Sequence, residues 1–168
     1  MKNNVDVSSL VDYLEKYSKE VGRITAADIR DELTETAFNA IVAFYESYTP
    51  RSYKRHYYNF LEKSFRKYYS NAHGTIFRGG VELTPQLMDN IYQSSAGYSP
   101  AQVTEQVFDT VYAGFHGVAS TQIYPGEAPR FSPAVMRPSP MELILSKRDE
   151  IENNLDKYIQ KAQSKVRI

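Results

Sequence analysis

The 168-residue sequence contains no cysteine, no hydrophobic run of membrane-spanning length and no excess of either charge. Without cysteine the chain has no disulfide, no thiol nucleophile and no thiolate metal site. A membrane span needs about 20 apolar residues, and no segment approaches that length. Lys and Arg together number 20, as do Asp and Glu, so the whole chain has no general attraction to nucleic acid or to anionic membranes. These absences predict a soluble protein that does not contact a membrane.

The length is near that of a single domain with one sizeable core, so residues 1–168 are predicted to form one domain. The N-terminal sequence MKNNVDVSSLVDYLEKY has charges throughout and no apolar run of signal-peptide length. We therefore expect no secretion through a signal peptide.

Catalytic motifs are also missing. The chain has no G-x-S-x-G, no S-x-x-K and no phosphate-loop lysine. Its three histidines, His56, His73 and His116, lack the close spacing of metal ligands. His116, between glycines in GFHG, is a candidate general base if Asp109 orients it, but a backbone-bound or interface loop histidine is the commoner case. We predict a protein that is not an enzyme, with no catalytic residue, no metal and no cofactor.

Apolar residues at spacings of three and four predict two N-terminal helices. The first runs to Val21 and is ended by Gly22, which makes residues 1–23 a peripheral helix. The second begins at a variant capping box, Thr25 with Asp28, and is stopped by Pro50. The apolar positions are Val7, Leu10, Leu14, Tyr17 and Val21 in the first, and Ile29, Leu33, Ala37, Ile41, Phe44 and Tyr48 in the second.

A short helix and a β-hairpin are predicted next. Tyr57, Phe60 and Leu61 lie on one helical face, with Phe65 and Tyr68 continuing the same spacing. FRKYY and TIFRGGVEL have the β-branched and aromatic content of strands, and SNAHG between them supplies the turn. Gly79–Gly80 within the second strand indicates a bulge or bend.

Three later helix starts share one pattern, a hydroxyl residue followed by proline, at Thr84, Ser99 and Ser139. Glu142 completes a capping box with Ser139, and a long amphipathic C-terminal helix follows. The segment from Gly114 to Pro140 holds five of the eight prolines and three glycines, which predicts a long loop over 114–139 with a short strand at STQIY. The fold class is therefore α+β, with several helices packed around a small antiparallel sheet.

Residues 51–69 are rich in tyrosine, lysine and arginine, which suits either of two surfaces. Cations with aromatic rings can bind nucleic acid, whereas tyrosine and arginine together are typical of protein interfaces. From Arg51 to Arg78 there are seven basic residues against Glu62 alone, and from Gly79 to Pro129 five acidic residues and no Lys or Arg. Such segregation allows head-to-tail packing of copies, or charge compensation within one fold.

The order of short motifs resembles the small neck and tail-completion proteins of tailed bacteriophages. Over residues 25–168 these motifs are a helix, Pro50, a basic stretch with Arg55 leading into L-x-x-S (Leu61 to Ser64), a hairpin, VYAGFHG, and a proline-rich loop ending at MRPSPMELILSKRDEI. The family commonly has T-G before the L-x-x-S, and this chain does not. The resemblance implies a structural virion protein without catalysis.

By this resemblance the chain acts in head–tail joining or tail completion, as a ring subunit with phage neck and tail proteins as partners. It would be located in the virion, assembled in the bacterial host cytoplasm, with non-specific DNA contact in a channel. The alternative is a DNA-binding accessory protein that uses residues 51–69. The residues expected at the interface are Arg51, Tyr53, Lys54, Arg55, Tyr57, Tyr58, His116, Arg130 and Arg137.

Overall fold

The structure, a computed structural model, describes residues 8–47, 57–72, 74, 76–92, 97–116, 135–136 and 138–167. It confirms the α+β class, because most elements are helices and the strands pair in antiparallel fashion. The elements are α1 (Ser8–Glu46), α2 (Tyr57–Lys63), β1 (Phe65–Ala72), β2 (Ile76–Leu83), the 3-10 helix η1 (Pro85–Leu87), α3 (Pro100–Tyr112), β3 (Phe115–His116), β4 (Val135–Met136), α5 (Pro140–Asn153) and α6 (Leu155–Lys165).

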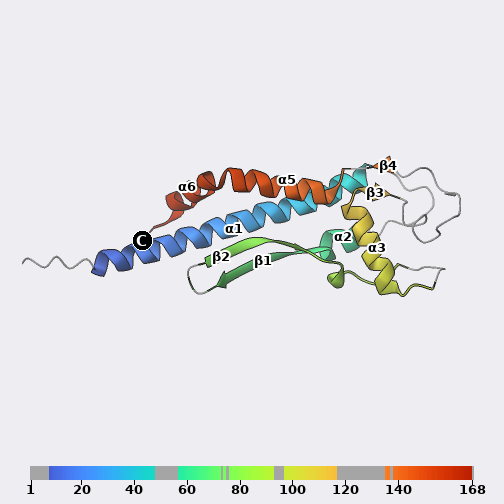
Figure 1. Cartoon of the computed structure of the whole chain (residues 1–168), viewed down its shortest axis with the longest axis horizontal. Coiled ribbons are helices and arrows are strands. Elements are labelled where there is room, and N and C mark those ends of the chain that lie inside the picture. Colours follow the sequence, from blue (N-terminus) through green and yellow to red (C-terminus); the bar gives the residue numbers. More distant parts are fainter. Residues whose placement is uncertain are drawn as a thin grey trace, which may run out of the picture.

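Helix α1 is the axis of an elongated molecule (Figure 1). The β1–β2 hairpin lies along one side of it, and α5 and α6 lie along the other. Helices α2 and α3 gather near the C-terminal end of α1. At the opposite end, α1 extends beyond both the hairpin and α6.

The prediction of two N-terminal helices is wrong, because α1 is one continuous helix of 39 residues, about 58 Å long at 1.5 Å per residue. Gly22 lies inside it, and Thr25 is a buried interior residue rather than a cap. A Cβ on Gly22 would lie 2.8 Å from Cδ2 of Phe77 on the hairpin. Glycine at this position therefore makes room for a neighbouring element and does not end the helix.

The predicted short helix and hairpin are confirmed as α2 followed by β1 and β2. Phe65 and Tyr68, however, belong to β1 rather than to the helix. The pairing runs without interruption from Phe65 opposite Leu83 to Ala72 opposite Ile76, so the predicted bulge is absent from this ladder. Gly79 has another role: a Cβ there would lie 1.9 Å from the carbonyl oxygen of Ala26, so glycine allows the strand to lie directly against α1.

All three predicted hydroxyl–proline caps are confirmed, although the helix after Thr84 is a three-residue 3-10 helix, and among the described hydrogen bonds Ser139 caps α5 without the predicted return bond from the Glu142 side chain. Thr84 accepts a hydrogen bond from the amide of Gln86, and Ser99 forms a reciprocal capping box with Gln102. Ser139 accepts from the amide of Glu142 at 3.2 Å. Each cap is followed by a proline within the first turn.

The long C-terminal helix is interrupted. Asn154 has φ −118° and ψ 20°, and it separates α5 from α6. Ile144 and Ile151 of α5 are buried as expected, whereas Leu155, at the start of α6, is exposed. The predicted amphipathic pattern continues in α6, where Ala162 is buried and Ile159 half-buried. The prediction is wrong only in making the helix continuous and in placing Leu155 on its buried face.

The predicted loop over 114–139 begins and ends in a short pairing, Phe115 opposite Met136 and His116 opposite Val135. Gly114, with φ 80°, makes the turn from α3 into β3. The predicted strand at STQIY lies outside the described residues.

The main core sits where the C-terminal part of α1 meets α2, α3 and α5. Its members are apolar or aromatic side chains from four helices, together with Met88 after η1. They are Ala37, Ile41, Phe44, Tyr45, Phe60, Met88, Phe108, Val111, Tyr112 and Ile144.

Candidate functional site

The structure places only part of the interface predicted from the sequence. Tyr57 and Tyr58 begin α2, with Tyr58 47% exposed, and His116 ends β3. These three residues of the predicted interface therefore belong to two elements, α2 and β3. Arg51, Tyr53, Lys54, Arg55, Arg130 and Arg137 lie outside the described residues.

The basic residues of the described half of the tyrosine-rich stretch are already paired with acids. Lys63 Nζ lies 2.7 Å from Asp89 Oδ1, and Arg66 Nε lies 2.7 Å from Glu82 Oε2 on the opposite strand. Lys67 Nζ lies 2.9 Å from Oδ1 of Asp31 on α1. Two of the acids belong to the segment 79–129, so the basic and acidic segments compensate each other here within one chain. This part of the stretch has little free positive charge for phosphates.

The motifs of the phage resemblance meet in a buried hydrogen-bonded junction. Ser64 Oγ donates to the carbonyl of Phe60 at 2.6 Å and lies 2.9 Å from the Tyr112 hydroxyl. The single proton of Ser64 is used on Phe60, so Tyr112 donates to Ser64. Ser139 Oγ in turn donates to the carbonyl of Tyr112 at 2.9 Å. The serine of L-x-x-S, the tyrosine of VYAG and the serine of MRPSP thus lock α2, α3 and α5 together.

A second buried contact joins α2 to the segment that follows η1. Asn59 is fully buried; its Nδ2 donates to the Asp89 carbonyl at 3.1 Å, and its Oδ1 accepts from the Asp89 amide at 2.8 Å. The ion pair between Lys63 and the Asp89 side chain flanks this contact. Burial raises the pKa of the Tyr112 hydroxyl to about 12. This hydroxyl therefore keeps the proton that it donates to Ser64.

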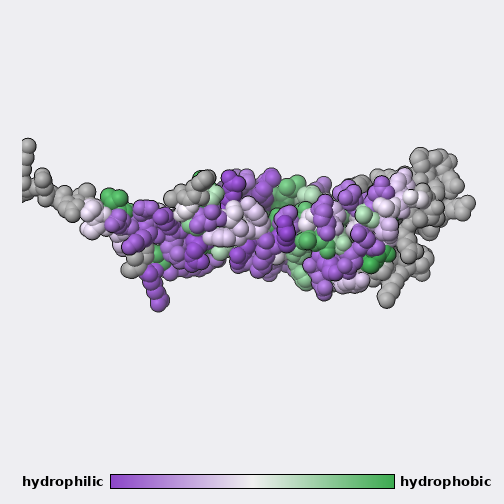
Figure 2. Space-filling view, turned by 90° about the horizontal axis from the view of Figure 1, so that it is seen from below, coloured by the Kyte–Doolittle hydropathy of each residue, from purple (hydrophilic) through white to green (hydrophobic). Residues whose placement is uncertain are grey.

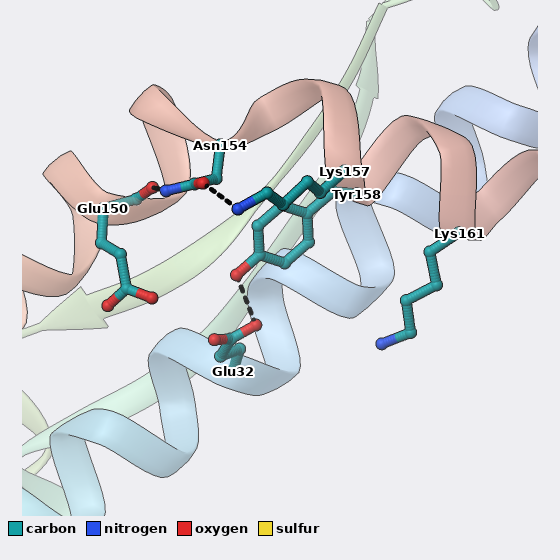
Figure 3. Close-up of a pocket in the computed structure, with 6 residues that line it drawn as sticks. All are labelled: Glu32, Glu150, Asn154, Lys157, Tyr158 and Lys161. Atoms are coloured by element: carbon teal, nitrogen blue, oxygen red, sulfur yellow. Dashed lines mark hydrogen bonds between the residues drawn. The ribbon is translucent and has the colours of Figure 1, made fainter.

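A shallow pocket of about 400 Å³ opens beside the break between α5 and α6 (Figure 3). Glu32 of α1 faces Tyr158 of α6, whose hydroxyl donates to Glu32 Oε2 at 2.8 Å. Lys147 Nζ lies 2.6 Å from Glu32 Oε1 and 3.1 Å from Glu150 Oε1. The lining residues are Glu32, Glu150, Asn154, Lys157, Tyr158 and Lys161.

The charges of three groups at this pocket are fixed around neutral pH. The hydrogen bond from Lys147 holds the pKa of Glu32 below its usual range, and the bond from Tyr158 adds to it. Burial, reinforced by Glu32, raises the pKa of Tyr158 to about 12. The two glutamates also raise the pKa of Lys147. These groups hold α5 and α6 on α1, and none of the three is tuned to exchange a proton near pH 7.

The free N-terminal part of α1 carries the most concentrated apolar exposure. Leu10, Val11 and Leu14 are 55%, 56% and 53% exposed, and Tyr13 is 46% exposed and stacks on Tyr17. Figure 2 shows hydrophobic residues at this projecting end, next to a long hydrophilic stretch. We call Leu10, Val11, Tyr13 and Leu14 the α1 tip. The sequence showed the apolar stripe but not its exposure among the described residues.

Two kinds of site are absent from the described ranges. They contain no group of three or more His, Asp or Glu side chains suited to a metal ion. Across the same residues, no helix combines the length and the apolar character needed to span a membrane.

Comparison of the chain with protein-family models, curated proteins and solved structures finds no match.

Proposed function

We propose that the protein is a structural subunit of a tailed-phage virion, acting in head–tail joining or tail completion as a member of a ring. The observation that carries this proposal is the α1 tip, a helix end that extends past the hairpin and α6 with its apolar side chains 46–56% exposed. Contiguous exposed apolar groups of this kind mark protein interaction sites.

The shape and chemistry of the molecule support the same proposal. A ring needs two different faces on each subunit that meet head to tail. The rod has two unlike ends, the α1 tip and the packed α2–α3 end. The motifs behind the phage resemblance meet at the packed end, in the junction of Ser64, Tyr112 and Ser139. On this proposal the protein is located in the virion, assembles in the bacterial host cytoplasm, and has other neck and tail proteins as partners.

DNA binding through residues 51–69 is the weaker proposal. Lys63, Arg66 and Lys67 are each within 3 Å of a carboxylate, so binding phosphate would compete with existing pairs. A binder of this kind would show a gel shift that weakens steeply with added salt.

Light scattering of the purified protein, alone and with neck and tail proteins expressed beside it, tests the proposal. We expect a discrete ring-sized species for the natural chain. The double variant Leu10→Ser/Leu14→Ser should lose that species while keeping its helix content by circular dichroism, because the lost apolar contact is intermolecular.

The matched control is Leu143→Ser/Leu145→Ser, which removes two exposed leucines from α5 instead. This control should assemble as the natural chain does. Assembly by the tip variant at the natural level would contradict the proposal. A strict monomer that ignores all partners but binds DNA in a salt-dependent manner would favour the rival.

A further inference from the structure

Helix α6 contacts α1 through several charged and polar side chains, beside a small apolar face on which Ala162 is buried and Ile159 half-buried. Lys165 Nζ lies 2.7 Å and Lys161 Nζ 3.4 Å from Asp28 Oδ2. The Tyr158 hydroxyl donates to Glu32. Ala162 is the single buried residue among the eleven described residues of α6. The neighbouring helix α5, by contrast, buries Pro140, Ile144 and Ile151.

The face of α1 beneath α6 is poorly matched to an apolar contact. Val21, Thr25, Asp28 and Glu32 follow one another at helical spacing, so they share one stripe of α1. Thr25 is buried, and its hydroxyl has no hydrogen-bond partner among the described residues. Opening this contact would let water reach that hydroxyl, which favours the open state.

Asn154 provides a point about which α6 can move. Its backbone leaves the helical conformation, and its side chain donates to the Glu150 carbonyl at 2.8 Å rather than capping α6. The shallow pocket lies beside this break, between Glu32 and Lys157 (Figure 3). The two C-terminal helices are therefore separate segments, joined at one residue next to open space.

We propose that α6 is a releasable strap, latched onto α1 by the Asp28 and Glu32 contacts and able to swing away about Asn154. Release uncovers the stripe from Val21 to Glu32. That stripe lies on the same side of α1 as Leu10, Leu14 and Tyr17 at the projecting end, so release lengthens the exposed face of α1 with a segment that includes two carboxylates. Strap opening is a property of the single chain and does not depend on ring assembly.

Two properties of the strap can be measured: how often it opens, and how its opening depends on salt. Exposed ion pairs add little stability and are screened by salt, with a Debye length that falls from about 10 Å at 0.1 M to about 3 Å at 1 M. An isolated helix of this length is also marginal in water. Helix α6 should therefore open more often than α5, and more often still at high salt.

Hydrogen exchange of the full chain, followed by mass spectrometry, tests the proposal. The exchange of peptides from 155–165 is compared with that of peptides from 141–153, which serve as an internal reference. We expect α6 to exchange at least about tenfold faster than α5 in dilute salt, with the ratio rising at least about threefold in 1 M NaCl. Equal protection of the two helices, or a ratio that salt leaves unchanged, would overturn the proposal.

Variants test the latch itself. Asp28→Asn removes the carboxylate that both lysines contact and should raise the α6 to α5 exchange ratio in dilute salt. Asp12→Asn makes the same charge change on α1, 16 residues away on the projecting part of the helix, and should leave the ratio unchanged. Lys161→Gln/Lys165→Gln removes the same pairs from the other side and replaces Asp28→Asn if that variant fails to fold. A ratio unaffected by either latch variant would refute the strap.

Discussion

The close contact between the hairpin and α1 makes Gly79→Ala a demanding test of the fold. A Cβ at this position would lie 1.9 Å from the Ala26 carbonyl oxygen and 2.7 Å from its carbonyl carbon. Both atoms belong to helix backbone, so no side-chain rotation relieves the clash. Overpacking usually costs about 1–3 kcal/mol, and a backbone neighbour places this variant at about 3 kcal/mol or above. At 2–4 °C per kcal/mol, Tm should fall by roughly 6–12 °C.

Gly80→Ala is the matched control on the next residue. Its Cβ would lie 4.0 Å from Leu33 Cδ1, an ordinary contact. Neither glycine is among those with positive φ, so alanine meets no backbone strain at either. Gly80→Ala should change the free energy of unfolding by about 1 kcal/mol or less in either direction. Urea denaturation followed by circular dichroism compares the two, and equal midpoints would refute the spacing of hairpin and helix described above.

Two further changes probe the junction and the charged contacts. Tyr112→Phe removes the hydroxyl that donates to Ser64 and should cost about 1 kcal/mol by urea denaturation; a double-mutant cycle with Ser64→Ala that shows no coupling would contradict the bond. The pKa of Glu32 lies below its ordinary 4.5 in the folded state, so its ionised form stabilises the fold above that pH, and this stability is lost as pH falls through the lowered pKa. Glu32→Gln should therefore flatten the fall of Tm between about pH 5 and pH 3, and an unchanged slope would contradict this origin.

Features encoded by adjacent residues could be predicted from the sequence. The caps at Thr84, Ser99 and Ser139 depend on a hydroxyl and the proline beside it, and each formed as expected. The hairpin likewise follows from two β-prone runs joined by a turn, with Gly74 at φ 72° in that turn. Such elements depend on residues that are adjacent in sequence, so they can be predicted without knowing the contacts of distant segments.

The roles of Gly22 and Gly79 could not be predicted from neighbouring residues, because both roles depend on tertiary contacts. Gly22 looked like a helix end and Gly79 like a bulge, yet each lies where the hairpin and α1 touch. An isolated glycine inside a helix costs only about 1 kcal/mol relative to alanine, and the packing of Phe77 offsets it. Thr25 resembled a cap because Asp28 follows it, but the continuing helix leaves it no free amide to bind.

The candidate sites were hidden for the same reason. Ser64 and Tyr112 are 48 residues apart, and Lys165 is 137 residues from Asp28. Composition showed the charge segregation along the chain but could not show that Lys63 meets Asp89. The α1 tip is exposed because the hairpin and α6 end before they reach it. The spacing of apolar residues in α1 does not predict where those other elements end.

Stability is distributed unevenly along the rod, and this bears on how it would assemble. The aromatic core and the junction around Tyr112 lie at the α2–α3 end. Toward the other end, α6 lies on α1 with ion pairs at its edge, and the first turns of α1 carry exposed apolar side chains. Segments that rearrange on binding are drawn from the least stable parts of a fold. A neighbouring subunit that docks on the α1 tip would therefore meet the part of the molecule that changes at least cost, while the packed end keeps its shape.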